Sequence, residues 1–503
     1  MELTPGIKKT VTTVGTECMV STAPLLARSE FLRKSVLKAM QKYVLAARNT
    51  PNQMDIPRPI GVDEDRHEFS NVIWQTADRI LAQNLSRPFL RNTGRNLVSG
   101  IMVDGGQRTA MSQFRETYGI NPPGFLTLSP GKACNLHCTG CYANAGAGAE
   151  KLEWRTFDRI ITEAETLWGV RFLVISGGEP LAYRSEGKGI LDAAAKHPNV
   201  FFLMYTNGTL IDDAMAKRLA ELGNVTPAIS VEGWRERTNE RRGPGVFEQV
   251  LQSMERLRRA GVPFGISLTA TRNNAEEILS DEFIDFFFNE QGVLYGWLFH
   301  YMPIGRSFTL DLMPTPEQRV WMWKRVWEII RQRHLFLADF WNHGTLSDGC
   351  LASGRSDGGG YLYVDWNGTV SPCVFVPYSP VNVREVYANG GTLNDIWKDP
   401  FFGSIRQWQG TYRKEKGNWL APCIIRDHHR DLRRLIALHE PEPTDENARK
   451  ALLDPDYARG MDQYDDAYQT LSDPYWKKYY LFSGKPGDGH NQSMRAGNKN
   501  NAG

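Results

Sequence analysis

The chain has 503 residues, which is long enough for two or three domains, and its composition of 41% hydrophobic and 23% charged residues is that of a soluble globular protein. Lys and Arg number 59 against 57 Asp and Glu, and the formal net charge of +2 argues against a dominant nucleic-acid surface. No stretch approaches the roughly 18–20 apolar residues of a membrane-spanning helix, and the N-terminus lacks a signal-peptide core. These features predict a cytoplasmic protein with no nucleic-acid partner.

The N-terminal 120 residues are predicted to form a helical cap. Apolar residues recur at helical spacing from Leu25 to Ala47 with basic residues between them, which indicates a basic amphipathic helix. This helix either packs on its own domain or contacts a membrane surface or an apolar substrate. Residues 50–68 are polar and contain proline, which indicates a linker. Further helices are predicted at Ser70–Gln83 and Pro88–Met102.

Six of the seven cysteines fall into two groups of three, which favours metal ligation over secreted disulfides. In the first group, Cys134, Cys138 and Cys141 stand at C-x3-C-x2-C spacing. Thiolates suit iron–sulfur clusters, zinc or Cu(I), but structural zinc takes four ligands, typically as separated pairs. The spacing therefore favours an iron–sulfur cubane with one iron left open for a small molecule. The seventh cysteine, Cys18, is interpreted as a plain buried or free thiol.

Between about residues 121 and 310, short apolar runs alternate with helical segments. Strands are predicted at Phe125–Leu128, Phe172–Ile175, Phe201–Tyr205, Thr226–Val231, Pro263–Ala270 and Tyr295–Tyr301. Helices are predicted at Thr156–Trp168, Ile190–Lys196, Asp212–Leu222, Phe247–Ala260 and Glu276–Phe287. Repeated strand–helix units predict a parallel sheet, whose functional loops lie at the C-terminal ends of the strands.

The second predicted strand ends in Ser176-Gly177-Gly178-Glu179-Pro180, where two glycines let the backbone come close to a ligand. This motif and the segment from Cys134 to Tyr142 closely resemble the radical S-adenosylmethionine (SAM) enzyme family. One departure is Gly140, because the family usually has an aromatic residue before the third cysteine and here Tyr142 follows it. The resemblance implies an α/β fold, an open six-stranded partial (β/α)6 barrel like part of a TIM barrel.

The resemblance also implies a [4Fe–4S] cluster on Cys134, Cys138 and Cys141, whose open iron binds SAM. Positions that match the family's SAM contacts are Tyr142, Gly177, Gly178, Glu179, Pro180, Asn207, Ser230, Glu232, Arg241, Ser267 and Met302. Arg242 is an alternative to Arg241 as the partner of the SAM carboxylate, because arginine recognises carboxylates in a fork geometry. A solvated arginine pair is the remaining interpretation.

The second cysteine group is Cys350, Cys373 and Cys423, in a region rich in glycine and turns that also contains the hairpin signal Asn367-Gly368. This region resembles the SPASM or twitch extension, which holds auxiliary [4Fe–4S] clusters. A full SPASM has seven cysteines for two clusters, so the three here imply one auxiliary cluster at most. Another metal or unliganded thiols are the alternatives.

Three cysteines leave the auxiliary cluster without a fourth protein sulfur. We expect a non-cysteine ligand there, with Asp427, His428 or His429 as candidates. An iron open to substrate and ligation by Cys18 are the alternatives. Where related sequences have a further cysteine, this chain has Ser356.

The predicted organisation has four parts: a helical cap at 1–120, the radical SAM barrel at 121–310, a bridging helix with the SPASM/twitch-like domain at 311–430, and a tail at 431–503 that is disordered from Pro486. Thr315-Pro316-Glu317-Gln318 is a start signal for the bridging helix. Trp321, Trp323 and Trp327 on this helix are predicted to belong to the core.

The predicted function is that of a radical SAM enzyme, which cleaves SAM reductively to a 5′-deoxyadenosyl radical and removes hydrogen from an unactivated C–H bond. The resemblance favours a peptide or protein substrate, as in SPASM maturases, with a lipid or small molecule as the alternative. A non-catalytic iron–sulfur electron-transfer or scaffold protein is the rival of a different class. The enzyme needs a reducing partner such as flavodoxin or ferredoxin, and weak membrane-surface contact is a further alternative.

Overall fold

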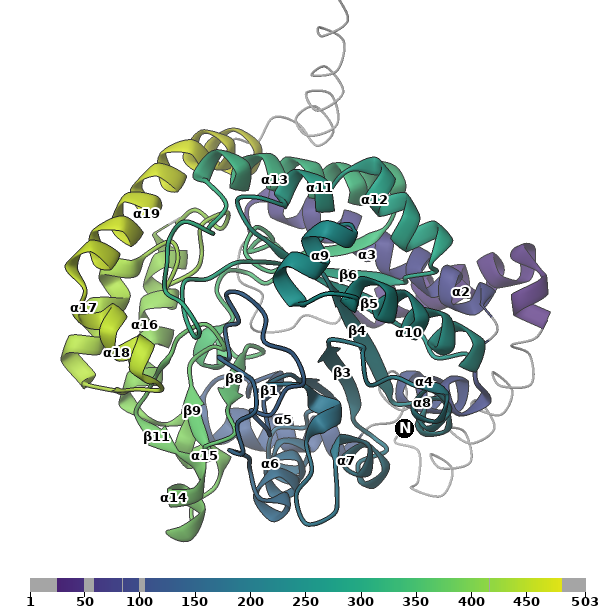
Figure 1. The fold of residues 1–503 in the computed structure, drawn as a ribbon, viewed down its shortest axis with the longest axis horizontal. Helices are drawn as coiled ribbons and strands as arrows, with labels where there is room; N and C mark the ends of the chain where they lie inside the picture. Colours follow the sequence, from purple (N-terminus) through teal and green to yellow (C-terminus); the bar gives the residue numbers. More distant parts are fainter. Residues whose placement is uncertain (1–24, 49–57, 84, 99–104, 416, 482–503) are drawn as a thin grey trace, which may run out of the picture.

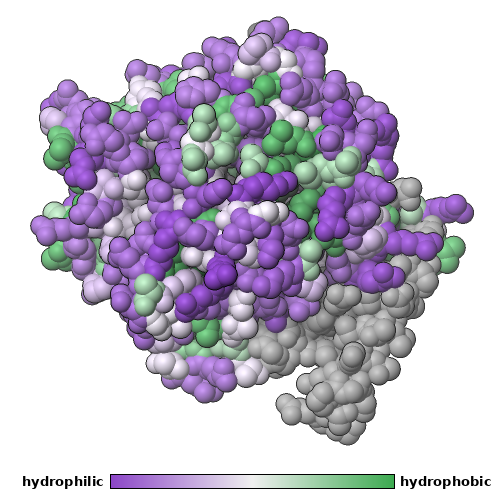
Figure 2. Space-filling view, turned by 60° about the horizontal axis from the view of Figure 1, so that its bottom comes forward, coloured by the Kyte–Doolittle hydropathy of each residue, from purple (hydrophilic) through white to green (hydrophobic). Residues whose placement is uncertain are grey.

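A computed structural model describes residues 25–48, 58–83, 85–98, 105–415 and 417–481. The interpretation of Cys18 and the disorder predicted from Pro486 onward fall outside these residues. In the described part of the chain, no helix is long and apolar enough to cross a membrane. The face drawn in Figure 2 is mostly hydrophilic, with hydrophobic side chains in small patches.

The core is a ten-stranded sheet with the order β11-β9-β8-β1-β2-β3-β4-β5-β6-β7. The six predicted strands are confirmed, with ends that shift by at most two residues, and they pair in parallel. They are β1 Phe125–Leu128, β2 Phe172–Ile175, β3 Phe201–Thr206, β4 Val225–Val231, β5 Gly265–Ala270 and β6 Tyr295–His300. Figure 1 shows the strands of this sheet in a curved row with helices on the outside, in agreement with the open barrel that the family resemblance implies.

The sheet continues beyond the six strands on both sides. β7 (Phe336–Asp339) lies parallel to β6, and β8 (Tyr361–Val364) lies parallel to β1. The Asn367-Gly368 hairpin is confirmed, because β8 turns there into the antiparallel β9 (Thr369–Ser371), followed by β11 (Val381–Asn382). The sequence predicts this hairpin as part of a separate domain, whereas the structure makes it an extension of the barrel sheet.

The helices of the barrel lie between consecutive strands and cover the outside of the sheet (Figure 1). They include α6 Trp154–Leu167, α7 Ile190–Lys196, α8 Asp213–Leu222 and α10 Val246–Ala260. The short α9 Arg235–Arg242 follows β4 and packs on α10. Gly223 and Gly261 end α8 and α10 in the left-handed conformation, which glycine adopts readily. The single helix predicted at Glu276–Phe287 is wrong. The Ser280 hydroxyl accepts the Phe283 N–H and begins a new helix, which leaves α11 Ala275–Ile278 and α12 Asp281–Asp285.

The N-terminal helices are α2 Glu30–Arg48, α3 Ile60–Ala82, α4 Arg87–Val98 and α5 Gly105–Tyr118. The linker predicted at 50–68 is wrong from Ile60 onward. Asp65 explains the error. Its carboxylate lies on the buried face of α3 and accepts hydrogen bonds from Thr345 and Tyr480. Because a charged residue occupies this buried face, the sequence there lacks the apolar pattern of a packed helix. The helices pack outside the barrel, with α3 on β7, α4 on α8 and α5 on α6.

The C-terminal half begins with the predicted bridging helix, α13 Pro316–Glu328, which has Thr315 as its N-cap. Trp323 and Trp327 are buried in the core as predicted, whereas Trp321 is 38% exposed. Further helices cover the region after the hairpin: α14 Val383–Ala388, α15 Leu393–Trp397, α16 Pro400–Lys414, α17 His429–His439, α18 Glu446–Leu453 and α19 Pro455–Trp476. A small ladder joins β10 (Tyr378–Ser379) to β12 (Glu442–Pro443).

Asp465 fastens α19 to the start of α17, because its buried carboxyl accepts the His429 backbone N–H at 2.7 Å. Burial raises the pKa of Asp465 to about 9, so the folded protein holds a proton at neutral pH that the unfolded chain releases above its ordinary pKa of about 4. The stabilising effect of that proton is complete at low pH. It is lost as pH rises toward 9, at up to about 1.4 kcal/mol per pH unit.

We therefore predict that Asp465→Asn, which does not titrate, is more stable than the wild type at pH 8, and that its advantage shrinks as the pH falls toward 4. Urea unfolding across this pH range measures the effect. Asp466→Asn is the matched control, because Asp466 is exposed and pairs with Arg430 at the surface. A difference between Asp465→Asn and the wild type that stays constant with pH would contradict the prediction.

Candidate active site

A cavity of about 410 Å³ lies within the curve of the sheet and collects residues from β1 to β6 and β8. Its strand-borne wall is largely apolar, with side chains that include Phe125, Val174, Leu203, Trp297 and Phe299. Cys134, Cys138 and Cys141 all line it. None of the N-terminal residues that the structure describes lines this cavity. Leu351, Val374 and Phe375, from the region after β7, do contribute.

The loop that carries the three cysteines is fastened to the loop after β2 by backbone hydrogen bonds. The Gly178 N–H donates to the Gly131 carbonyl at 2.9 Å, and the Glu179 N–H donates to the Ala133 carbonyl at 2.8 Å. A Cβ atom on Gly178 would lie 2.2 Å from the Ala133 carbonyl oxygen. Gly178 is therefore needed first for the approach of the two loops to each other, although it also lines the cavity.

Glu179 lies behind the cavity wall. Its buried carboxylate accepts hydrogen bonds from the Thr206 hydroxyl at 2.7 Å, the Asn207 N–H at 2.8 Å and the Leu181 N–H at 3.1 Å. Burial raises its pKa, and the three donors act against this rise. Glu179 thus joins the ends of β2 and β3. The structure places Glu179 and Pro180 outside the cavity wall, away from the ligand contact that the sequence suggests.

Hydrogen-bond donors surround the first cysteine group. The Leu136 N–H lies 3.4 Å and the Asn207 side-chain amide 3.8 Å from the Cys134 sulfur, and an Arg242 nitrogen lies 4.0 Å from the Cys138 sulfur. Burial raises the pKa of the Cys134 thiol to about 11, so a metal would have to displace its proton. Donors of this kind stabilise thiolates and suit an anionic iron–sulfur cluster.

Zinc fits the described residues less well. Within them, no three His, Cys, Asp or Glu side chains converge closely enough to hold one metal ion. A cubane places each cysteine on a different iron, so its ligands need not converge on one point. The donor set at Cys134, Cys138 and Cys141 therefore fits a cluster better than a single ion.

Arg241 and Arg242 both line the cavity, and both pair with the buried carboxylate of Glu232. Glu232 itself does not reach the wall. The two arginine side chains are only 16% and 12% exposed, so the interpretation as a solvated pair is wrong. Glu232 holds both guanidinium groups beside the cysteines, where they would meet an anionic ligand group.

The other residues singled out from the sequence lie in the cavity wall, namely Tyr142, Gly177, Asn207, Ser230, Ser267 and Met302. His300 also lines the cavity, although no sequence motif points to it. His300 Nε2 lies 3.1 Å from the Asp339 carboxylate, and burial lowers the pKa of His300 to about 4, so the ring is neutral at pH 7. Nothing in the sequence links these two residues, because they meet only where β6 and β7 end side by side.

The structure also brings the second cysteine group together. Burial raises the pKa of Cys423 well above its ordinary range, and Asp427, Cys350 and Cys373 raise it further. Burial likewise raises the pKa of Cys373 to about 12. None of the three lines the large cavity, but their neighbours Leu351 and Val374 do. The second group thus lies behind one wall of the cavity, and its all-sulfur donor set fits an iron–sulfur cluster.

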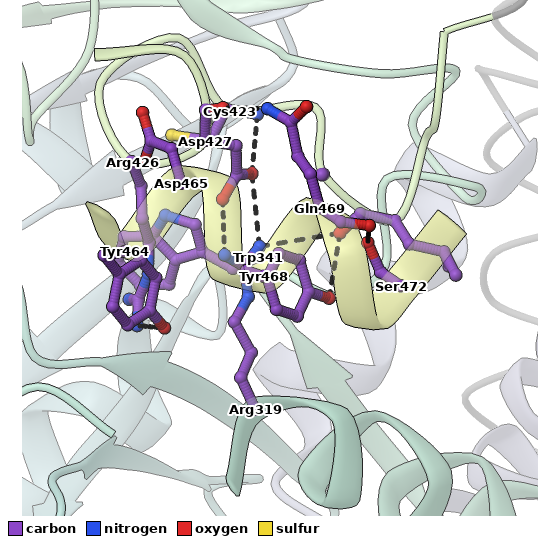
Figure 3. A network of polar contacts seen from close by, with 12 residues as sticks. Arg319, Trp341, Cys423, Arg426, Asp427, Tyr464, Asp465, Tyr468, Gln469 and Ser472 are labelled. Carbon is purple, nitrogen blue, oxygen red and sulfur yellow. Dashed lines mark hydrogen bonds and ion pairs between the residues drawn. The ribbon is translucent and has the colours of Figure 1, made fainter. Parts of the chain in front are cut away.

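The candidates for a fourth ligand are each engaged elsewhere. Asp427 forms a buried ion pair with Arg319 of α13 and accepts the Cys423 N–H at 3.0 Å (Figure 3). The His428 ring nitrogen lies 2.9 Å from the Ala421 carbonyl, and His429 packs on Tyr457. Asp427 remains a candidate fourth ligand because its carboxylate lies next to Cys423. To bind iron it would have to give up its ion pair with Arg319.

Comparison with known proteins shows which class of enzyme the chain belongs to. Residues 128–281 match the Radical SAM superfamily, and residues 356–424 match the SPASM iron–sulfur cluster-binding domain. The chain therefore contains a radical SAM domain followed by a SPASM domain. It is an enzyme of the radical SAM class, and its domains imply SAM, a [4Fe–4S] cluster and additional iron–sulfur binding.

Individual relatives differ in how far they match. The chain is 26% identical over 306 residues to the AdoMet-dependent heme synthase of Methanosarcina barkeri, covering 56% of this chain and 83% of that protein. It is 28% identical over 154 residues to the sporulation killing factor maturation protein SkfB of Bacillus subtilis, covering 30% and 37%. The structure of Streptococcus suis SuiB bound to precursor peptide SuiA superposes with a TM-score of 0.48 at 19% identity, covering 62% and 72%.

We predict that Gly178→Ala displaces the cysteine loop, because the new methyl group would meet backbone oxygens of Ala133 and Lys132. Overpacking of this kind costs about 1–3 kcal/mol. The purified variant should contain less iron and sulfide per chain and unfold at a lower temperature. Gly146→Ala, in the same loop, is the control, because its Cβ would make ordinary contact with His137 at 3.6 Å. Full iron content in purified Gly178→Ala would contradict the predicted displacement of the cysteine loop.

Proposed function

We propose that this enzyme binds SAM and its catalytic [4Fe–4S] cluster in the large cavity and acts on a C–H bond of a substrate held there. The observation that carries this proposal is the cavity itself, which Cys134, Cys138 and Cys141 share with Gly177 and Gly178. The three cysteines would hold the cluster, which with SAM supplies a 5′-deoxyadenosyl radical. Arg241 or Arg242 would bind the SAM carboxylate, and Ser230 would contact its ribose or carboxylate.

The protein's own contribution is to position the substrate and exclude water. Phe125, Val174, Leu203, Trp297 and Phe299 form an apolar wall that keeps a reactive carbon radical away from solvent. Phe375, from the C-terminal region, extends this wall of the cavity, since its ring contacts Phe299 and Phe340. The whole site therefore needs both halves of the chain.

The first candidate substrate is a peptide or protein. SkfB is named for the maturation of a killing factor, and this relationship supports a maturase-like activity. The second candidate is a small molecule. It is favoured by the extent of the match to the heme synthase, which covers 83% of that protein, and by the aromatic wall of the cavity.

Cys350, Cys373 and Cys423 are proposed to hold the auxiliary cluster. Cys373 is buried, and Cys350 and Cys423 are half-buried. These exposures and the position of the three cysteines behind the cavity wall support this assignment. A reducing partner such as flavodoxin or ferredoxin would supply electrons.

We predict that replacing Cys134, Cys138 and Cys141 together by alanine abolishes SAM cleavage and leaves the auxiliary cluster in place. The assay is 5′-deoxyadenosine formation by anaerobically reconstituted protein with dithionite and SAM. The triple substitution Cys350/Cys373/Cys423→Ala is the matched control, because it should remove the other cluster and still permit SAM cleavage. Undiminished 5′-deoxyadenosine in the first variant would refute the assignment, and none from the wild type would favour a non-catalytic scaffold.

Helix α2 supports a further proposal, that the protein makes weak contact with a membrane surface. On one side it packs on α3, and Arg33 pairs there with Asp78 at 2.9 Å. On the other side Phe31, Leu32 and Val36 are 79%, 44% and 39% exposed. Apolar side chains beside basic ones are the pattern of a helix that lies at a lipid surface.

We predict weak, salt-sensitive flotation of the protein with anionic vesicles. Phe31→Ser with Val36→Ser should reduce it, because the substitutions remove apolar area without disturbing the Arg33–Asp78 pair. Equal flotation of this double variant and the wild type would favour plain packing of the helix within the protein. Neutral vesicles of the same size serve as the control for nonspecific recovery.

A further inference from the structure

One side chain of the cavity wall also contacts the second cysteine group. Tyr361, the first residue of β8, lines the cavity with its buried ring, and the ring stacks on Phe125 of β1 at 4.9 Å between centroids. Its hydroxyl oxygen lies 2.8 Å from the sulfur of Cys373. Tyr361 thus belongs to the cavity by its ring and to the second cysteine group by its hydroxyl.

The direction of this hydrogen bond follows from the chemistry of the two groups. A cysteine that ligates iron is a thiolate and has no proton to give, whereas a phenol keeps its proton at neutral pH. The tyrosine must therefore donate when Cys373 holds a cluster. The backbone N–H of Phe375 gives the same sulfur a second donor at 3.5 Å.

We propose that Tyr361 is a positioning residue for the auxiliary cluster, which orients Cys373 and raises the cluster's reduction potential through this hydrogen bond. The proposal rests on the assignment of Cys373 as a cluster ligand. Reduction adds one negative charge to a cluster, and a donor to a ligating sulfur stabilises the more negative state more strongly. Because β8 pairs with β1 along its whole length, the donor is fixed to the barrel sheet and not to a mobile loop.

The test uses the full chain with Cys134, Cys138 and Cys141 changed to alanine, so that the auxiliary cluster is the only one observed. Its midpoint potential is measured by an EPR-monitored redox titration after anaerobic reconstitution. Tyr361→Phe removes the hydroxyl and keeps the ring. We expect the reduced-to-oxidised ratio at a fixed potential to fall on the order of tenfold, which is about 59 mV for one electron.

Tyr363→Phe is the matched control, because Tyr363 lies two residues along the same strand and is also buried. It should leave the potential unchanged. Tyr361→3,5-difluorotyrosine is a second variant that retains the hydroxyl as a stronger donor, and it should move the potential upward. This variant keeps the test decisive even if Tyr361→Phe fails to assemble the cluster.

Equal midpoint potentials in the parent, Tyr361→Phe and difluorotyrosine proteins would overturn the inference while leaving the cluster assignment intact. Equal downward shifts in Tyr361→Phe and Tyr363→Phe would also overturn it, because the effect would then be a general loss of polarity. A parent protein without any cluster would overturn the ligand assignment, and the inference with it.

Discussion

The site depends on the backbone hydrogen bonds between the cysteine loop and the loop after β2. The cysteine loop contains no regular helix or strand, and its own backbone hydrogen bonds, such as that from the Cys134 N–H to the Gly146 carbonyl, are isolated. Gly131 and Ala133 accept hydrogen bonds from Gly178 and Glu179, and the buried Glu179 carboxylate then fastens these residues to the end of β3. Three successive loops become one rigid surface in this way, which is what a catalytic cluster requires of its ligands.

A second constraint joins the two iron–sulfur regions. The hairpin of β8 and β9 adds to the barrel sheet directly beside β1, the strand that leads into the cysteine loop. The buried pair of Arg319 and Asp427 ties the loop after Cys423 to α13 (Figure 3). Breaking either partner alone would leave an uncompensated charge in the interior, which is strongly unfavourable. The two cysteine groups are therefore held within one packed core.

The period of the sequence was sufficient for the parallel strands, because they are short apolar runs separated by capped helices, as at Gly223 and Gly261. The curvature of these strands into a barrel was implied by the family resemblance and not by the period. The sequence also placed the polar part of the cavity, since the three cysteines, Gly177, Gly178 and Asn207 stand in recognised motifs, but it did not identify the apolar wall. It did not predict that Glu179 and Glu232 would lie outside the cavity wall, each bonded to residues of neighbouring segments. Both carboxylates bind donors that themselves line the cavity, such as Thr206 and Arg241, and these pairings depend on the tertiary packing of neighbouring loops.

Other features had no local signal at all. The pairing of His300 with Asp339 needs β6 and β7 to be adjacent, and the start of α3 was hidden because Asp65 faces the interior. Strand β8 was predicted as half of a hairpin, correctly, but its parallel pairing with β1 joins residues more than two hundred positions apart. Long-range pairing of this kind leaves no trace in the period of a single sequence.

The position of β8 has a consequence for any attempt to study the barrel alone. If the chain were cut after β6, one side of β1 would lose its partner strand and expose a row of unpaired backbone N–H and C=O groups. β1 is short and apolar, and three of its four residues are buried. Such an edge invites pairing with other chains, so a barrel produced without its C-terminal half should self-associate into aggregates before its chemistry can be examined.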